Sequence, residues 1–142
     1  MTGPAYDDSN VFAKILRGEL PSFTVYEDEH TLAFMDIMPR SDGHTLILPK
    51  TPSRNLLDAD PAVLGPLMVT AQRVAQAAMR AFNADGIMLT QFSEAPAGQT
   101  VFHLHLHVIP RYEGGVLRPE GTKGDMAAIE AHAKALKAAL AG

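Results

Sequence analysis

The chain contains no cysteine, and this absence sets the first limits on its chemistry. Disulfide bonds are excluded, and so are metal sites built on thiolates. No apolar run approaches the roughly 18–20 residues that are needed to span a bilayer, so no membrane segment is expected. Lysine and arginine nowhere form a run of three, and the net charge is −4. Because binding to a nucleic acid normally requires a basic patch, nucleic acid is not an expected partner.

The first eight residues also lack the marks of a targeting segment. They are polar and acidic, without the basic and apolar stretches of a secretory signal. We therefore expect residues 1–8 to be a loose tail and the protein to be cytoplasmic. The remaining residues, 9–142, fit a single domain, since the hydrophobic content of 46% and the charged content of 20% are ordinary for a globular chain.

Apolar periodicity and capping residues predict helices in three places. Ser9 or Asn10 can cap a short helix over 11–17, with Gly18 directly after it. A long helix is expected from Asp60-Pro61 to about 83, because proline fits the first turn. Asp125 is expected to cap a C-terminal helix that ends near 141.

Strands are predicted in two blocks, and the blocks do not alternate with helices. The segments rich in β-branched, aromatic and aliphatic residues are 23–27, 31–37, 45–48, 87–92 and 100–109. Strands grouped in this way predict an α+β fold with a five-stranded, largely antiparallel sheet. The long helix, the short N-terminal helix and an additional C-terminal helix complete the expected domain.

The last predicted strand contains three histidines at alternate positions. Side chains alternate across a strand, so His103, His105 and His107 are expected on one face, about 6.5–7 Å apart. Val101 and Ile109 share this face. The opposite face is apolar and is expected to pack on the core, against the long helix; it consists of Phe102, Leu104, Leu106 and Val108.

Three imidazoles in a row favour phosphoryl chemistry. A neutral imidazole can attack phosphorus and form a covalent intermediate, while neighbouring imidazoles donate hydrogen bonds or protons. The central residue, His105, has a potential donor on either side and is the expected nucleophile. Two alternatives stay open: the three histidines ligate a transition metal, or they have no role on an exposed face. No carboxylate lies within the strand, which weakens the metal hypothesis.

The loop before the histidines, Ala97-Gly98-Gln99-Thr100, suits an anionic ligand. Glycine lets the backbone approach a ligand closely, so that backbone N–H groups can bind a phosphate oxygen. The amide of Gln99 and the hydroxyl of Thr100 add further donors. An ordinary hairpin loop is the alternative interpretation.

Residues 98–111, with the sequence GQTVFHLHLHVIPR, resemble the signature of the histidine-triad (HIT) superfamily. The similarity continues upstream in segments 10–21, 34–39 and 43–50. It implies a protein that binds purine nucleotides and cleaves or transfers at the α-phosphate through a covalent nucleotidyl-His105. Substrates of this class are nucleoside phosphoramidates and dinucleoside polyphosphates.

The resemblance also assigns roles to individual residues. His105 corresponds to the nucleophile and His107 to the donor toward phosphate or leaving group, while His103 and His44 correspond to positioning residues. Asp36 corresponds to the acceptor of ribose hydroxyls, although a turn or surface role is the alternative. The phosphate or leaving group is expected at Gly98, Gln99 and Thr100. The base pocket, for which core packing is the alternative, is expected to consist of Phe12, Ile15, Phe34 and Ile37.

Three departures from the family pattern qualify these expectations. Asn10 and Ala13 stand where some bacterial members carry two zinc-binding cysteines, so that structural zinc site is expected to be lost. Segment 91–96 lacks the asparagines of many members, and Ser93 or Gln91 is expected to substitute for them. The stretch after Arg111 does not match the phosphoramidase branch, which leaves the substrate open.

Cofactor and partner expectations follow from the same resemblance. No metal is required for attack by a neutral histidine, although Mg²⁺ could assist a polyphosphate leaving group. Arg111 and Arg118 are expected to be surface charges, and contact with a polyphosphate is the alternative. A homodimer is expected, because members of the family usually pair. Two other functions remain: a purine-nucleotide binding or scaffold protein with vestigial catalysis, and a metalloprotein.

Overall fold

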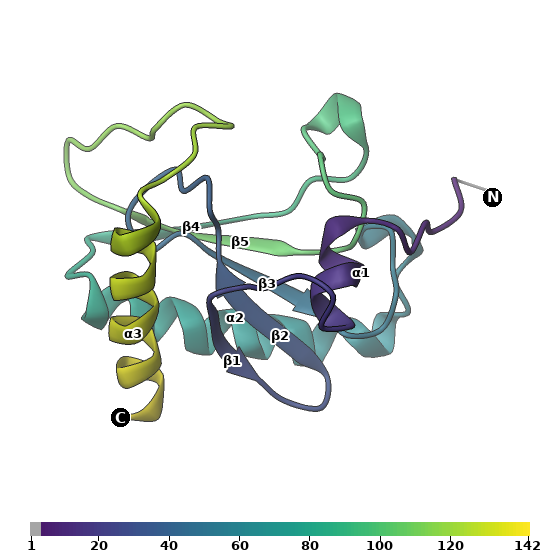
Figure 1. Ribbon diagram of the computed structural model, residues 1–142, viewed down its shortest axis with the longest axis horizontal. Helices are drawn as coiled ribbons and strands as arrows, with labels where there is room; N and C mark the ends of the chain where they lie inside the picture. Colours follow the sequence, from purple (N-terminus) through teal and green to yellow (C-terminus); the bar gives the residue numbers. More distant parts are fainter. Residues whose placement is uncertain (1–3) are drawn as a thin grey trace.

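The computed structural model describes residues 4–142, so the first three residues of the expected tail lie outside it. The helices are α1 (Val11–Leu16), α2 (Pro61–Ala81) and α3 (Met126–Ala141), and two short 3-10 turns are η1 (Leu56–Asp58) and η2 (Ala95–Ala97) (Figure 1). The strands are β1 (Thr24–Glu27), β2 (Thr31–Met35), β3 (Thr45–Pro49), β4 (Gly86–Thr90) and β5 (Leu106–Arg111).

The five strands form one sheet in the order β1-β2-β3-β5-β4, and every neighbouring pair is antiparallel. The predicted α+β fold is therefore confirmed. In the pairing of β3 with β5, Leu46 lies opposite His107. The strand that carries His107 is thus hydrogen-bonded to β3, which begins directly after His44.

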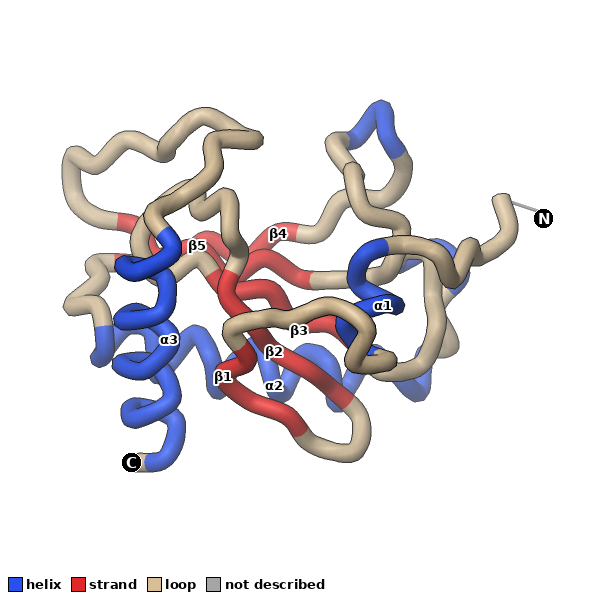
Figure 2. Tube along the Cα trace, viewed as in Figure 1, coloured by secondary structure: helices blue, strands red, loops and turns tan. Residues whose placement is uncertain are grey.

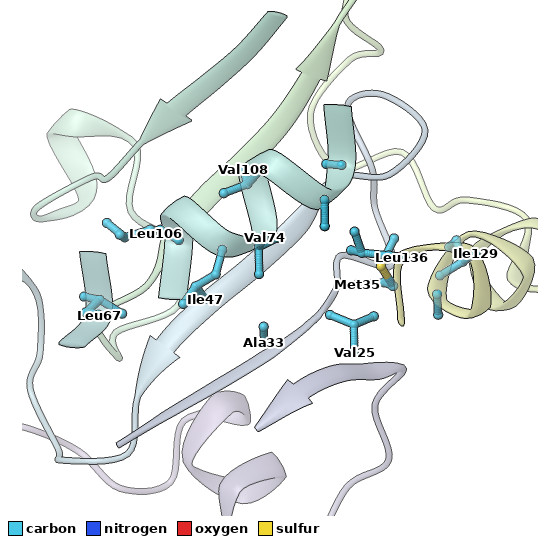
Figure 3. Close-up of a cluster of buried hydrophobic side chains, with 14 of the residues drawn as sticks. Val25, Ala33, Met35, Ile47, Leu67, Val74, Leu106, Val108, Ile129 and Leu136 are labelled. Atoms are coloured by element: carbon cyan, nitrogen blue, oxygen red, sulfur yellow. The ribbon is translucent and has the colours of Figure 1, made fainter. Parts of the chain in front are cut away.

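The two faces of the sheet have different covers, because side chains alternate along each strand. On one face Ala33, Met35 and Ile47 join Leu106 and Val108 in the main core, which α2 and α3 complete with Val74 and Leu136 (Figure 3). On the other face α1 packs Phe12 against a smaller cluster. That cluster contains Leu32, Phe34, Leu46 and Leu48.

Side-chain caps start the three helices where the sequence predicted them. Asn10 accepts a hydrogen bond from the N–H of Ala13, Asp60 from Ala62 and Asp125 from Ala127. Each cap satisfies a backbone donor that has no partner within its helix. Gly18 follows α1 with φ +77°, the left-handed conformation expected of a residue just after a helix.

The fifth strand is shorter than predicted. It begins at Leu106 instead of Thr100, since the preceding backbone pairs with a loop: the N–H of Leu104 donates to the carbonyl of Ser53 at 2.8 Å. Phe102 is consequently not a core residue, and the Arg54 guanidinium lies 4.1 Å above its ring centroid. The prediction that His103, His105 and His107 belong to one strand is therefore wrong: only His107 lies in β5, and the side chain of His103 is fully buried.

A long irregular segment joins β5 to α3 and lies beside the loop that follows β2 (Figure 2). Arg118 donates its N–H to the carbonyl of Arg40 at 2.8 Å, and Nε of Arg40 donates to the carbonyl of Arg118 at 2.9 Å. The guanidinium of Arg118 pairs with Asp42 on the surface. Within residues 4–142, no helix combines the length and apolarity needed to cross a bilayer.

Candidate active site

Two adjoining cavities open beside His105 and His107. The larger, of about 410 Å³, is mainly apolar and is called the apolar cavity here. The smaller, of about 220 Å³, contains Arg40, Phe92 and Glu120 and is called the polar cavity. The two cavities share lining residues: Asp36, Met38, Thr100, His105 and His107. The two histidines therefore stand at the junction of two binding spaces.

Most of the residues predicted to form the site meet around these cavities. The expected base-pocket residues line the apolar cavity: Phe12, Ile15, Phe34 and Ile37. His44, Gly98, Gln99 and Thr100 line the polar cavity. Ser93 lines neither cavity, and its hydroxyl exchanges hydrogen bonds with the side-chain amide of Gln91 at 3.1 and 3.2 Å.

The ring of His105 is held in one tautomer. Its Nδ1 lies 2.6 Å from the carbonyl oxygen of His103, which can only accept, so Nδ1 carries the proton. Burial lowers the pKa of His105 below its ordinary value, which keeps the ring neutral. Phe12 packs edge-on against the ring, with centroids 4.9 Å apart. The Nε2 lone pair is thus left free for attack on an electrophile.

A second chain of hydrogen bonds fixes the proton of His107. The backbone N–H of Arg40 donates to Nδ1 of His44 at 3.0 Å, so a neutral His44 carries its proton on Nε2. That nitrogen lies 3.0 Å from Nδ1 of His107, which must then accept. Burial lowers the pKa of both histidines to about 3, so both rings are neutral near pH 7. Nε2 of His107 is left as an N–H donor.

The same residues bear on the metal hypothesis. One potential ligand atom each from Asp36, His44 and His107 lie within 4.8 Å of one another. However, the Nε2 atom that His44 would offer to an ion carries the proton donated to His107. Both nitrogens of His103 have protein partners, the hydroxyl of Tyr6 and the carbonyl of Pro49. His103, His105 and His107 are therefore not arranged to ligate one ion.

The side chain of Gln99 organises its loop and has no amide hydrogen left for phosphate. Its Nε2 donates to the carbonyls of Arg54 and Val101 at 2.8 and 3.0 Å. Its Oε1 accepts from the N–H of Glu94 at 2.8 Å and from Asn55 at 3.1 Å. The expectation that this amide donates to phosphate is therefore wrong, whereas the exposed Thr100 remains available at the cavity.

Several residues of the site carry no motif that sequence analysis could have used. Asn55, which is buried, bridges Gln99 and Glu94, and Arg54 forms a bidentate ion pair with Glu94 at 2.8 and 2.9 Å. These contacts span about forty positions of chain, so only the fold reveals them. Tyr6, which contacts His103 across 97 positions, was missed for the same reason.

Comparison with known proteins agrees with this geometry. The HIT domain matches residues 17–114 of the chain. This protein belongs to the HIT family. The HIT fold is shared with a Hit-like protein involved in cell-cycle regulation from Bartonella henselae, which is 51% identical with a TM-score of 0.92, over 96% of this chain and 99% of that one.

Two proteins are similar to this HIT protein in sequence. Protein hit of Bacillus subtilis is 40% identical over 105 residues, which cover 74% of this chain and 72% of that protein. Adenylylsulfatase HINT3 of Arabidopsis thaliana is 39% identical over 103 residues, which cover 72% of this chain and 52% of that protein. The resemblance first seen in the histidine motif is thereby confirmed.

Proposed function

We propose that this HIT protein is a nucleotide hydrolase or nucleotidyl transferase that cleaves at the α-phosphate of a purine nucleotide conjugate. The observation that carries the proposal is the pair of fixed tautomers. His105 presents a free Nε2 lone pair and His107 an Nε2–H donor, at the junction of two cavities. A nucleophile next to a proton donor is the arrangement that nucleotidyl transfer needs.

The nucleoside is proposed to occupy the apolar cavity. Phe12 and Phe34 meet edge to face there, with centroids 5.4 Å apart, and offer apolar surface to a flat base. Asp36 lies where this cavity meets the polar one, and its Oδ1 is held by the N–H of Met38 at 2.8 Å. The other oxygen, Oδ2, lies 3.4 Å from Nε2 of His44, and the carboxylate is proposed to accept from ribose hydroxyls.

The proposed reaction has two steps with balanced protons. Nε2 of His105 attacks phosphorus, and the bond from phosphorus to the leaving group breaks while the Nε2–H of His107 hydrogen-bonds to that group and solvent supplies its proton. Water then attacks the nucleotidyl-His105, the P–N bond breaks, and the attacking water releases a proton to solvent. The products are a nucleoside monophosphate, the protonated leaving group and the original neutral histidines.

The leaving group is proposed to occupy the polar cavity. Its position beside Arg40 and Thr100 supports nucleoside phosphoramidates and dinucleoside polyphosphates as candidate substrates. The similarity to an adenylylsulfatase supports an anhydride-type bond at the α-phosphate as well. No metal is needed for the attack itself, although Mg²⁺ could neutralise a polyphosphate leaving group.

The test is AMP release in excess EDTA from adenosine phosphoramidate and from diadenosine tetraphosphate. His105→Ala is expected to lower the rate at least about 10³-fold, because the nucleophile is removed. His30→Ala is the matched control, since His30 is exposed, pairs with its neighbour Glu29 and lines neither cavity. Thermal melting would verify that both variants are folded.

The outcomes separate the competing functions. Release by wild type and by His30→Ala alone supports the histidine mechanism, and the faster substrate identifies the bond. Nucleotide binding without release by any form favours the binding or scaffold function, for which the missing asparagines of segment 91–96 are the motivation. Activity that appears only after metal is added would favour the metalloprotein.

We also propose that the protein is a homodimer. Five exposed large apolar residues lie on and next to α2 and the edge strand β4: Leu56, Leu57, Met68, Val69 and Leu89. Met68, Val69 and Leu89 also line a hollow of about 390 Å³ with Ile87. A second copy would cover such a patch by symmetric pairing.

A further inference from the structure

Tyr6 lies in the segment that the sequence predicted to be a loose tail, yet it contacts the histidine cluster. Its hydroxyl oxygen is 2.6 Å from Nδ1 of His103, and the two rings meet edge to face with centroids 5.6 Å apart. Tyr6 is half-buried and lines neither the apolar nor the polar cavity. It therefore acts on the site through His103 and not through substrate.

The partners around His103 determine the direction of this hydrogen bond. Nε2 of His103 lies 2.8 Å from the carbonyl of Pro49, which can only accept, so Nε2 carries a proton. Burial lowers the pKa of His103, which keeps the ring neutral and leaves Nδ1 as an acceptor. The phenol of Tyr6 must then be the donor. Its oxygen in turn accepts from Nδ2 of Asn10 at 3.1 Å, so the chain of donors is complete.

The backbone of His103 connects these hydrogen bonds to the nucleophile. The carbonyl oxygen of His103 accepts the Nδ1–H of His105 at 2.6 Å, the contact that leaves Nε2 of His105 free. A ring bonded at both nitrogens cannot rotate, so the peptide group of the same residue is held as well. Since residues 101–105 lack strand pairing, these side-chain contacts replace the rigidity that a sheet would supply.

We propose that Tyr6 is a positioning residue for catalysis. By donating to Nδ1 of His103 it fixes the orientation of that ring, and through the His103 carbonyl it aligns His105 for in-line attack. The kinetic part of this inference rests on the proposed function. The structural part, the hydrogen bond from the Tyr6 hydroxyl to Nδ1 of His103, does not.

Tyr6→Phe tests the inference, because it removes one hydroxyl and keeps the ring that packs on His103. Misalignment of a nucleophile slows chemistry without weakening ground-state binding, so kcat should fall about 10-fold while KM stays nearly constant. In ¹⁵N NMR spectra of histidine-labelled protein, the Nδ1 resonance of His103 should move toward that of an imidazole nitrogen without a hydrogen bond.

Two further variants test whether the effect of Tyr6→Phe is specific to its hydrogen bond with His103. Tyr112→Phe is the matched control, since its hydroxyl donates to the carbonyl of Phe82 at 2.9 Å away from the cavities, and it should leave kcat unchanged. Asn10→Asp keeps the cap of α1 but replaces the donor to Tyr6 with a carboxylate that competes for the phenol proton. It should lower kcat in the same direction as Tyr6→Phe, and it serves if that variant does not fold.

The possible results are distinct. A fall in kcat with a shifted His103 signal, absent from Tyr112→Phe, supports the proposal. An unchanged kcat with an unchanged His103 signal, a change confined to KM, or an equal fall in Tyr112→Phe would overturn it. If wild type releases no AMP at all, the proposed function fails, and the NMR signal alone decides: a shift in Tyr6→Phe supports the Tyr6–His103 link, and no shift refutes it.

Discussion

At the scale of single residues, the partners of each imidazole decide its role. His105 meets a carbonyl at Nδ1, whereas His44 meets a backbone N–H at the same atom. The first contact leaves an acceptor free at Nε2 of His105. The second leaves an N–H donor at Nε2 of His44. This group donates to Nδ1 of His107, so the proton of His107 is on Nε2. The same side chain thus supplies a nucleophile in one place and a proton donor in another.

Keeping these rings neutral makes stability depend on pH. The pKa of His44 and of His107 is about 3 in the folded chain and near 6.5 in the unfolded chain. Between these values the unfolded state binds more protons, so the free energy of unfolding falls as the pH falls below about 6.5. From pH 7 to pH 5 each histidine should cost about 2 kcal/mol, observable as a lower urea midpoint.

His44→Gln is the comparison that isolates this effect, because glutamine can still donate to His107. The variant should lose less stability than wild type over the same pH range. Asp36, whose pKa is raised by burial, acts in the opposite direction in both proteins. A urea midpoint of wild type that is equal at pH 7 and pH 5 would contradict neutral, buried imidazoles.

At the scale of elements, sequence patterns correctly predicted the features that depend on neighbouring residues alone, such as helix caps. Asn10, Asp60 and Asp125 cap their helices as expected, because a cap involves only neighbouring backbone. The strand expected over 100–109 failed in its first half, because the backbone partner of Leu104 is Ser53, about fifty positions away. Nothing in the alternating pattern of residues 101–107 reveals that contact.

The candidate site likewise contains residues that a local motif predicts and residues that only the fold brings together. The histidine motif, the glycine loop and the family resemblance were sufficient to predict most of the cavity lining. The roles of Tyr6, Asn55 and Arg54 depend on contacts between distant segments. For Gln99 the motif placed the residue correctly, but the neighbours that use up its amide could not be seen in the sequence.

Gly43 links the loop that carries His44 to the end of α2. It has φ +91°, and a Cβ atom there would lie 2.5 Å from the ring of Phe82. Gly43→Ala should therefore lower the free energy of unfolding by roughly 2–4 kcal/mol, through backbone strain and displacement of the ring. Chemical denaturation would measure this loss.

Gly18→Ala is the control for Gly43→Ala. Gly18 has φ +77°, but no atom lies within 4 Å of the position that a Cβ atom would take there. Only the backbone strain then applies, roughly 1–2 kcal/mol. Equal losses in the two variants would show that contact with the Phe82 ring contributes nothing to the loss of stability in Gly43→Ala.

At the scale of the whole molecule, one of the two edges of the sheet, strand β4, lies beside an apolar helix face. Within residues 4–142, β4 pairs with β5 on one side only. The N–H and C=O groups of its outer edge are available to another strand, and the exposed side chains of Met68, Val69 and Leu89 lie next to them. An edge and an apolar patch that adjoin are suited to the same twofold contact.

The proposed homodimer can be tested by sedimentation velocity. Met68→Lys should shift the protein from dimer to monomer, because two like charges would be buried at a symmetric interface without partners. Val116→Lys is the control: Val116 is 92% exposed, but it lies on the segment after β5, so the protein should remain dimeric with a lysine there. A wild-type protein that sediments as a monomer at micromolar concentration would refute the homodimer. A dimer that persists in Met68→Lys would place the interface elsewhere, because a buried, unpaired lysine on both copies is too costly for the contact to survive.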